Sequence, residues 1–129
     1  HIEGDHIESA TTPVISAQCL RVACSDGHMA AASVKFKNKP SKEVMIERWN
    51  SFKGRAQELN LPSAPEHYLT YFEEDNRPQT KLDRNLENGM GVSIGRLRED
   101  TIFDYKFVSL SHNTLRGAAG GAVLMAELL

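Results

Sequence analysis

Two runs of strand-forming residues near the C-terminal end, joined by a short polar turn, constrain the fold of this chain most strongly. Residues 90–98 (MGVSIGRLR) and 102–111 (IFDYKFVSLS) are rich in β-branched and aromatic side chains, which suit a pleated, half-buried surface. Glu99, Asp100 and Thr101 supply the turn between them. Such a pattern is typical of a hairpin. We therefore predict two long antiparallel strands here.

Further strands are expected upstream of this pair. Residues 14–24 (VISAQCLRVAC) have strand composition, residues 25–27 (SDG) supply turn chemistry, and residues 28–36 alternate small and apolar side chains with others. Within residues 28–36, His28 is the first residue on the strand face that carries the apolar side chains. Pairing across the turn would bring residues 17–23 beside residues 28–36. A short strand is expected within residues 67–72 (HYLTYF).

One long helix is expected between these strands. Ser41 is suited to the N-cap position, and the apolar residues that follow recur at spacings of 4, 3, 4 and 3, which is one helical stripe: Met45, Trp49, Phe52, Ala56 and Leu59. Gly54 should weaken or bend the second half of the helix. The pattern predicts an α+β domain, with a mixed, largely antiparallel sheet of four or five strands and helices against one face.

The last segment, residues 113–129 (NTLRGAAGGAVLMAELL), should also be helical. Gly117, Gly120 and Gly121 each cost about 1 kcal/mol relative to alanine in a helix interior. Close approach of another backbone or of a ligand is the usual compensation. The glycine run matches neither G-x-G-x-x-G nor the G-x-x-x-x-G-K-[ST] phosphate loop. Asn113, at the start of this helix, is free to present its amide to a ligand.

Composition limits the classes of protein. With 129 residues, the chain holds one domain at most. Fifteen basic and 17 acidic residues give a net charge of -2, so we expect neither nucleic acid nor membrane as a partner. No apolar run spans a bilayer and no secretory signal is present, which favours a cytoplasmic protein with reduced thiols. Residues 1–13 are expected to be a linker or terminal arm, and a first residue other than Met suggests a fragment or a processed product.

His28 and Arg21 form one candidate site. His28 follows Asp26 and Gly27 at a turn-to-strand junction, where a side chain can be directed into a cleft as a general acid or base. Arg21 lies seven residues earlier among apolar neighbours and could hold a carboxylate. The alternatives are a structural or surface histidine, and an arginine at a sheet edge whose charged end reaches solvent.

Two other features of the sequence are weaker candidates for a functional site. Cys19, Cys24 and His28 raise the question of a zinc site, but a closed site needs four ligands and His67 and His112 have no partner at ligand spacing. We therefore predict no metal, and two buried structural thiols. The charge-rich run at residues 72–88 alternates in sign and is expected to be a solvated loop or a subunit contact.

Four blocks of sequence resemble the C-terminal catalytic region of the aspartate-semialdehyde dehydrogenase family, in the branch found in fungi and archaea. The resemblance extends from about residue 15 to residue 129, in order and with the spacing of the family. The blocks are CLRV with DGH at 19–28, DNRPQ with LDR at 75–84, VSIGRLR at 92–98, and SHNT running into GAAG at 111–120. The resemblance implies the C-terminal domain of the glyceraldehyde-3-phosphate dehydrogenase-like fold.

The resemblance also implies roles for single residues. The general acid/base histidine of the family falls on His28, the arginine that grips the substrate carboxylate falls on Arg21, and the asparagine that approaches the nicotinamide falls on Asn113. Members of the family reduce aspartyl phosphate to aspartate semialdehyde with NADPH, through a thioester on a cysteine, in the biosynthesis of lysine, methionine, threonine and isoleucine. These residue types suit that chemistry.

The resemblance is partial. The family's nucleophile sits in an Asn-Cys-Thr type of motif, and neither Cys19 nor Cys24 has that context. We therefore expect residues 14–112 to be a catalytic and dimerisation domain, and residues 113–129 a helix that packs on a separate NADP-binding domain. The chain alone should be inactive and should pair with a second copy, as a homodimer or within a tetramer. The alternatives are a domain like that of N-acetyl-glutamyl-phosphate reductase, and a non-enzymatic interaction module.

Overall fold

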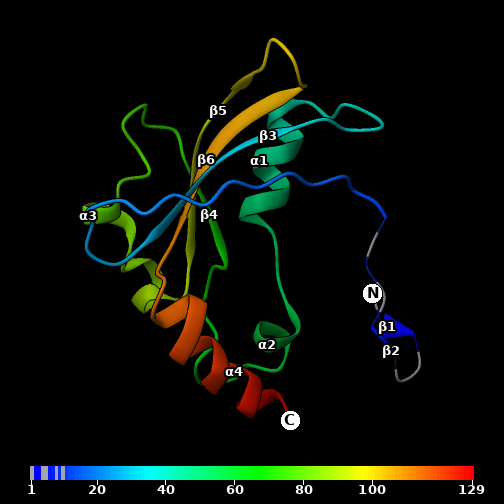
Figure 1. The fold of residues 1–129 in the computed structure, drawn as a ribbon. Coiled ribbons are helices and arrows are strands. Elements are labelled where there is room, and N and C mark those ends of the chain that lie inside the picture. The colour runs from blue at the N-terminus through cyan, green and yellow to red at the C-terminus, as the bar shows by residue number, and fades with distance from the viewer. Residues whose placement is uncertain (1, 4–5, 8, 10) are drawn as a thin grey trace.

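The computed structural model describes residues 2–3, 6–7, 9 and 11–129. A single four-stranded sheet and its helices follow a short N-terminal ladder (Figure 1). The elements are β1 (Ile2–Glu3), β2 (His6–Ile7), β3 (His28–Val34), α1 (Lys42–Asn50), α2 (Arg55–Glu58), β4 (Leu69–Phe72), α3 (Thr80–Asp83), β5 (Val92–Glu99), β6 (Tyr105–Ser111) and α4 (Gly120–Leu128). A 3-10 turn at Leu86–Gly89 precedes β5, and a π-helical turn at Leu115–Ala119 leads into α4. The predicted arm at residues 1–13 lies partly outside the described residues.

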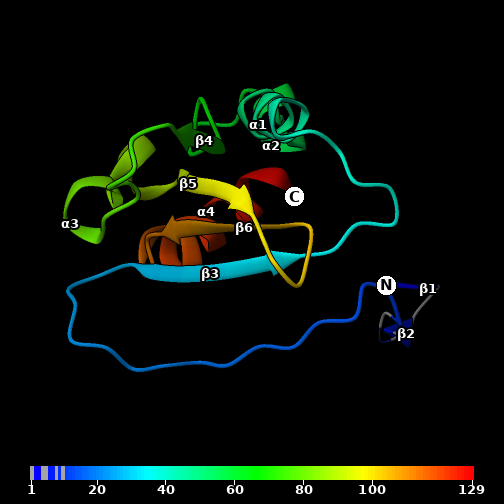
Figure 2. The ribbon, with the colours of Figure 1, turned by 90° about the horizontal axis from the view of Figure 1, so that it is seen from above.

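The sheet has the order β3-β6-β5-β4, and Figure 2 shows the strands side by side in this order. β5 and β6 pair antiparallel, with Ser93 opposite Leu110. β3 pairs antiparallel with β6, and β4 runs parallel to β5. The predicted hairpin and the mixed, largely antiparallel sheet are therefore confirmed. β3 and β4 are the two edges.

The predicted strand at residues 14–24 is wrong. Residues 14–24 belong to no helix or strand, and Val14 and Leu20 are 94% and 75% exposed. Within the described part of the chain, β3 pairs with β6 alone, so the predicted hairpin with residues 17–23 is wrong too. Strand propensity measures how well side chains fit a half-buried pleated surface. These side chains meet no such surface, so their composition does not determine their conformation.

The long predicted helix is two helices. Ser41 caps α1 as predicted, because its Oγ accepts a hydrogen bond from the Val44 backbone N–H at 3.3 Å. The chain leaves the helix after Asn50, and Gly54 adopts an extended conformation before α2. A Cβ on Gly54 would lie 3.0 Å from the ring of Tyr68. The glycine therefore permits a close passage over that ring, which a continuous helix would not make.

The core lies mainly between one face of the sheet and the helices. At the α1 end, Trp49 stacks on Tyr71 with ring centroids 5.9 Å apart and tilts against Phe107 at 5.1 Å. These rings surround a buried cluster of Met45, Leu97 and Tyr105. At the other end, α2 and α4 bury a second cluster of Ala56, Tyr68, Met90 and Leu124. Packing of α1 on this face agrees with the prediction, whereas α3 lies on the opposite face, so the helices are not confined to one face.

The charge-rich run covers the opposite face over β4 and β5. A Cβ on Gly95 would lie 2.5 Å from the carbonyl oxygen of Arg77, so this run passes directly over β5. Asp83 in α3 is only 4% exposed, and its carboxylate accepts hydrogen bonds from the Arg77 guanidinium and from the Gln79 backbone N–H. The hydrogen bond to Asp83 raises the pKa of Arg77. The expectation of a solvated loop is therefore wrong at Asp83, because a buried carboxylate needs partners.

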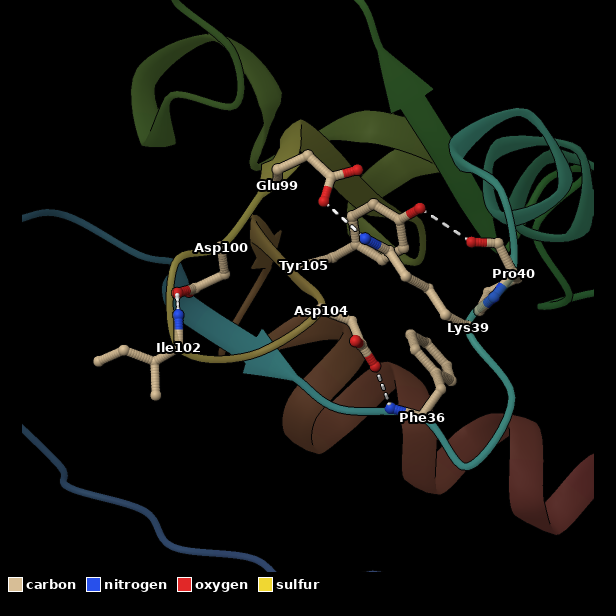
Figure 3. A network of polar contacts seen from close by, with 8 residues as sticks. All are labelled: Phe36, Lys39, Pro40, Glu99, Asp100, Ile102, Asp104 and Tyr105. Carbon is tan, nitrogen blue, oxygen red and sulfur yellow. Dashed lines mark hydrogen bonds and ion pairs between the residues drawn. The ribbon is translucent and has the colours of Figure 1, made fainter.

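A polar network fixes the far end of the sheet, where the β5–β6 hairpin meets the connection from β3 to α1 (Figure 3). The Phe36 backbone N–H donates to Asp104 Oδ2 at 2.7 Å, and Lys39 Nζ lies 2.6 Å from Glu99 Oε2. Tyr105 donates its hydroxyl to the Pro40 carbonyl oxygen at 2.8 Å. These contacts position the start of α1.

The C-terminal helix forms as predicted, and the expected close approach is found at Gly120 but not at Gly117, where a Cβ would lie 3.6 Å from the carbonyl oxygen of His112. A Cβ on Gly120 would lie 2.6 Å from Met90 Sδ and 2.9 Å from the carbonyl oxygen of Leu115. The π-helical turn at Leu115–Ala119 thus folds back closely on the start of α4. A larger residue at position 120 would separate α4 from Met90.

Candidate functional site

His28 is the first residue of β3, and its backbone is opposite Ser111 of β6. Its side chain is exposed. The turn before it requires unusual backbone angles, since Asp26 has φ of 40° and Gly27 has φ of 119°. Only glycine adopts the second angle readily. The turn chemistry of Ser25, Asp26 and Gly27 was predicted, and it places the imidazole at the beginning of an edge strand.

Gly27 is the fixed point of this turn. It is buried, and a Cβ there would lie 3.2 Å from Leu110 Cδ1 and 3.3 Å from Thr80 Cγ2. Its backbone N–H donates to Oδ1 of Asn113 at 3.1 Å. The structure therefore brings the predicted acid/base residue and the predicted cofactor residue together. Figure 2 shows the start of β3 beside the start of the C-terminal helical segment.

Asn113 is half-buried, and its amide oxygen is occupied. Besides the Gly27 N–H, that oxygen receives the hydroxyl of Thr114 at 3.4 Å. The free backbone N–H groups at the helix start are bound by a neighbour instead, because His112 Nδ1 accepts from Thr114 and Leu115 at 3.1 Å each. His112 is buried, and its capping role was missed since histidine is not a usual cap residue. The amide of Asn113 is thus only half free for a ligand, through its NH₂ group.

Arg21 lies in the exposed segment ahead of the turn. Among the described residues it makes no hydrogen bond and no ion pair. The expected proximity of Arg21 to His28 depended on a strand pair that the structure lacks. The role of Arg21 therefore stays a prediction from the resemblance.

Cys19 and Cys24 are free and exposed. The prediction that both thiols are buried is therefore wrong, because residues 14–24 form no strand and are exposed. The Cys24 thiol lies 3.9 Å from the carbonyl oxygen of Gly27, where it can donate a weak hydrogen bond. The described residues contain no group of three or more histidine, cysteine or acidic side chains placed to hold a metal ion. Neither thiol contacts His28 through a hydrogen bond in the part of the chain that the structure describes.

Arg84 was not predicted as a site residue. Its Nη1 donates to the Ser25 carbonyl oxygen at 3.0 Å and to the Ser25 hydroxyl at 2.6 Å. Arg84 follows α3, which is separated from the turn by more than 50 residues of chain. The sequence offered one signal, the LDR block at 82–84 within the resemblance, but no spacing rule connects it to position 25.

The site and the sheet together define a class of protein. The class is that of α+β domains with a mixed four-stranded sheet, in which an edge strand begins at an exposed histidine and the last helical segment begins against the turn before it. None of the described helices is long and apolar enough to cross a membrane.

Comparison with known proteins identifies the family. Residues 2–116 match the family described as semialdehyde dehydrogenase, dimerisation domain. The chain belongs to this family. It is 48% identical over 117 residues to aspartate-semialdehyde dehydrogenase of Saccharomyces cerevisiae, covering 89% of this chain and 32% of that protein. It is 45% identical over 117 residues to malonyl CoA reductase (NADP) of Metallosphaera sedula, covering 89% of this chain and 33% of that protein.

A solved structure agrees with these sequence relationships. Aspartate semialdehyde dehydrogenase from Candida albicans, solved with NADP, superimposes with a TM-score of 0.71 at 40% identity. The match covers 81% of this chain and 30% of that one. The resemblance recognised in the sequence is thereby confirmed, as is the fold class. The chain spans about a third of the length of the curated relatives it matches.

Proposed function

We propose that this domain forms part of an NADP-dependent enzyme that reduces aspartyl phosphate to aspartate semialdehyde and releases phosphate. The observation that carries the proposal is the hydrogen bond between the Gly27 N–H and Asn113 Oδ1 at 3.1 Å. It holds the residue before His28 against the residue that the family places near the nicotinamide. An acid/base group beside the cofactor position is what such a reduction needs.

We propose that His28 transfers a proton to and from the oxygen of the substrate carbonyl group as the tetrahedral centre forms and breaks down. An exposed imidazole at the start of an edge strand can reach a substrate without rearrangement of the sheet. Arg21 is proposed to bind the substrate carboxylate through its planar guanidinium, which matches a carboxylate in geometry. Its position in an exposed segment leaves all of its donors available to a ligand.

The residues present fit a nicotinamide at Asn113. Its amide oxygen is held by Gly27, which orients the NH₂ group, and no described residue accepts a hydrogen bond from that group. A carboxamide oxygen is a suitable acceptor for it. When bound, the reduced cofactor NADPH would supply the hydride. Asn113 would hold the ring, and His28 would handle the proton.

The nucleophilic cysteine is proposed to lie outside these 129 residues. Both thiols present lie in the exposed segment, and neither has the sequence context of the family's nucleophile. We propose that the separate NADP-binding domain packs against α4. That helix carries one charged residue, Glu127, and is otherwise apolar, yet only Leu124 in it is buried, while Val123 and Met125 are 52% and 58% exposed. A helix of this composition is normally covered.

Self-association is the function proposed for the domain itself. Its family is described as a dimerisation domain. β3 is an edge strand with few large side chains, and Met29 on it is 51% exposed. We propose that a second copy of the chain covers the β3 side of the sheet as a homodimer.

A second candidate substrate follows from the Metallosphaera sedula relative, which is named for reducing malonyl CoA. The two candidates are separated by assaying the full-length protein in the direction of aldehyde oxidation. We expect NADP reduction with aspartate semialdehyde that depends on inorganic phosphate. Reduction of NADP with malonate semialdehyde and coenzyme A, and none with aspartate semialdehyde and phosphate, would select the second candidate. Activity with neither would refute both.

A further inference from the structure

The turn that delivers His28 has little support from its own neighbours in sequence. Residues 11–26 ahead of it are exposed and belong to no helix or strand. β3 is an edge strand, so one side of its backbone is unpaired in the described sheet. A catalytic group at the start of such a strand needs support from elsewhere, because small misplacements reduce rates strongly.

Two side chains from distant segments provide that support. Asn113 binds the Gly27 N–H on one side. On the other side, the Arg84 guanidinium donates from Nη1 to both the carbonyl oxygen and the hydroxyl of Ser25, at 3.0 and 2.6 Å. The turn is therefore held at its first and third residues, and His28 follows the second of these anchors directly.

The segment that contains Arg84 is itself held in place by several contacts. It follows Asp83, whose buried carboxylate is bound by Arg77 and by the Gln79 N–H. The Arg77 guanidinium lies over the ring of Phe72 in β4, 4.3 Å from its centroid. This chain of contacts runs from one edge strand of the sheet to the turn at the other edge. Thr80 in the same helix packs near the Cα of Gly27, which adds an apolar contact to the polar ones.

We infer that Arg84 is a positioning residue for His28 in the reduction, acting through Ser25 and the turn. The inference rests on the proposed function of His28. The guanidinium touches neither substrate nor cofactor in this account. Its effect is to fix the direction in which the imidazole enters the site. Loss of Arg84 should therefore lower the turnover rate and leave substrate affinity nearly unchanged.

The experiment uses the full-length protein, with Arg84→Met, Arg84→Lys and His28→Ala, and with Arg55→Met as the matched control. Arg55 is an exposed arginine in α2 that pairs with Glu58, and such pairs contribute little. We expect Arg84→Met to lower kcat about tenfold or more with KM within twofold. Arg84→Lys, which can still donate to Ser25, should recover part of the rate, and Arg55→Met should match the parent.

The double variant distinguishes a role of Arg84 that acts through His28 from a merely structural role. If Arg84 acts through His28, then adding Arg84→Met to His28→Ala should change kcat less than twofold, because the two residues work as a unit. A further tenfold loss in the double variant, or an Arg84→Met enzyme with kcat within twofold of the parent, would overturn the inference.

Failure of the proposed function has a different signature. A parent with no activity, or one unaffected by His28→Ala, would remove the role of His28 and leave Arg84 to be judged by hydrogen exchange. In that case the peptide containing Ser25, Gly27 and His28 should exchange about tenfold faster in Arg84→Met than in Arg55→Met. Equal exchange in the two variants would show that Arg84 does not order the turn.

Discussion

The backbone N–H of Gly27 and Oδ1 of Asn113 are 3.1 Å apart, although 86 residues separate them in the chain. This hydrogen bond joins the start of an edge strand to the start of the last helical segment. It makes the geometry of the proposed acid/base residue depend on the residue proposed to contact the cofactor.

His28→Ala in the full-length protein should lower kcat about 100-fold or more, because a positioned acid/base contributes about that much. The assay is phosphate-dependent reduction of NADP by aspartate semialdehyde. His67→Ala is the control, since His67 is more than half exposed and pairs with Glu87. A His28→Ala enzyme with kcat within twofold of the parent would contradict the assignment.

Asn113→Ala and Asn113→Asp should separate the two uses of this side chain. Both remove the NH₂ donor, so both should raise KM for NADP, by up to about tenfold for one hydrogen bond. Aspartate retains an oxygen for the Gly27 N–H, so only alanine should speed hydrogen exchange of that amide. Asn38→Ala, at an exposed position beyond the other end of β3, is the control. Equal exchange in the Ala and Asp variants would show that the Gly27 contact is unimportant.

Asp83→Ala should destabilise the fold by about 2 kcal/mol or more, because it leaves the Arg77 guanidinium and the Gln79 N–H without their charged acceptor. Urea unfolding followed by Trp49 fluorescence measures the loss. Glu58→Gln is the control, where an exposed pair should contribute less than about 0.5 kcal/mol. Similar free energies of unfolding for both variants would contradict a structural role for the buried carboxylate.

Asp100 should stabilise the β5–β6 hairpin only where it is ionised. Its pKa is lowered from the ordinary value of 3.8, chiefly by the hydrogen bond from the Ile102 N–H and also by that from the Ser33 hydroxyl. A pKa that is lower in the folded state gives stability that is present above 3.8 and is lost as the pH falls through the folded pKa.

The stability difference between parent and Asp100→Asn should therefore shrink as the pH falls below 3.8. Urea midpoints at neutral pH and through the acid range measure it. Ser33→Ala removes one donor to the carboxylate, so it should reduce the pH-dependent part without abolishing it. A difference that stays constant into the acid range would contradict the role of the ionised group.

The isolated chain should dimerise, and Met29→Lys should weaken the dimer by placing a charge on the β3 side of the sheet. Sedimentation velocity at tens of micromolar measures the state of association. Val44→Lys is the control, because Val44 is similarly exposed but lies on α1. A parent that sediments as a monomer at this concentration would refute self-association of the domain alone.

The sequence predicted those parts of the fold in which local pattern and tertiary packing agree. The β5–β6 hairpin, the Ser41 cap and the C-terminal helix are of this kind. Residues 14–24 have strand composition but no surface to pack on, so their pattern misled. Gly54 was expected to bend a helix, but it lies between two helices as the N-cap of α2, since the position of the Tyr68 ring cannot be known from spacing.

The candidate site shows the same difference between what local sequence patterns predict and what depends on tertiary packing. Turn chemistry placed His28 correctly at the start of a strand, and the glycines of the last helix pointed to a close approach that Gly120 makes. The contacts of Arg84 with Ser25 and of Asn113 with Gly27 join segments that no periodicity relates. Long-range hydrogen bonds of this kind depend on the order of the strands, which the sequence did not supply.

The exposed segment of residues 11–26 affects how the protein should be handled. A trypsin-like protease would find Arg21 in extended, unpaired chain and would need no local unfolding to cleave after it. Cleavage there would detach the residue proposed to hold the substrate carboxylate. The anchors at Ser25 and Gly27 lie beyond the cut and would keep His28 in place. A nicked preparation would therefore retain its fold and the position of His28 while losing affinity for the substrate.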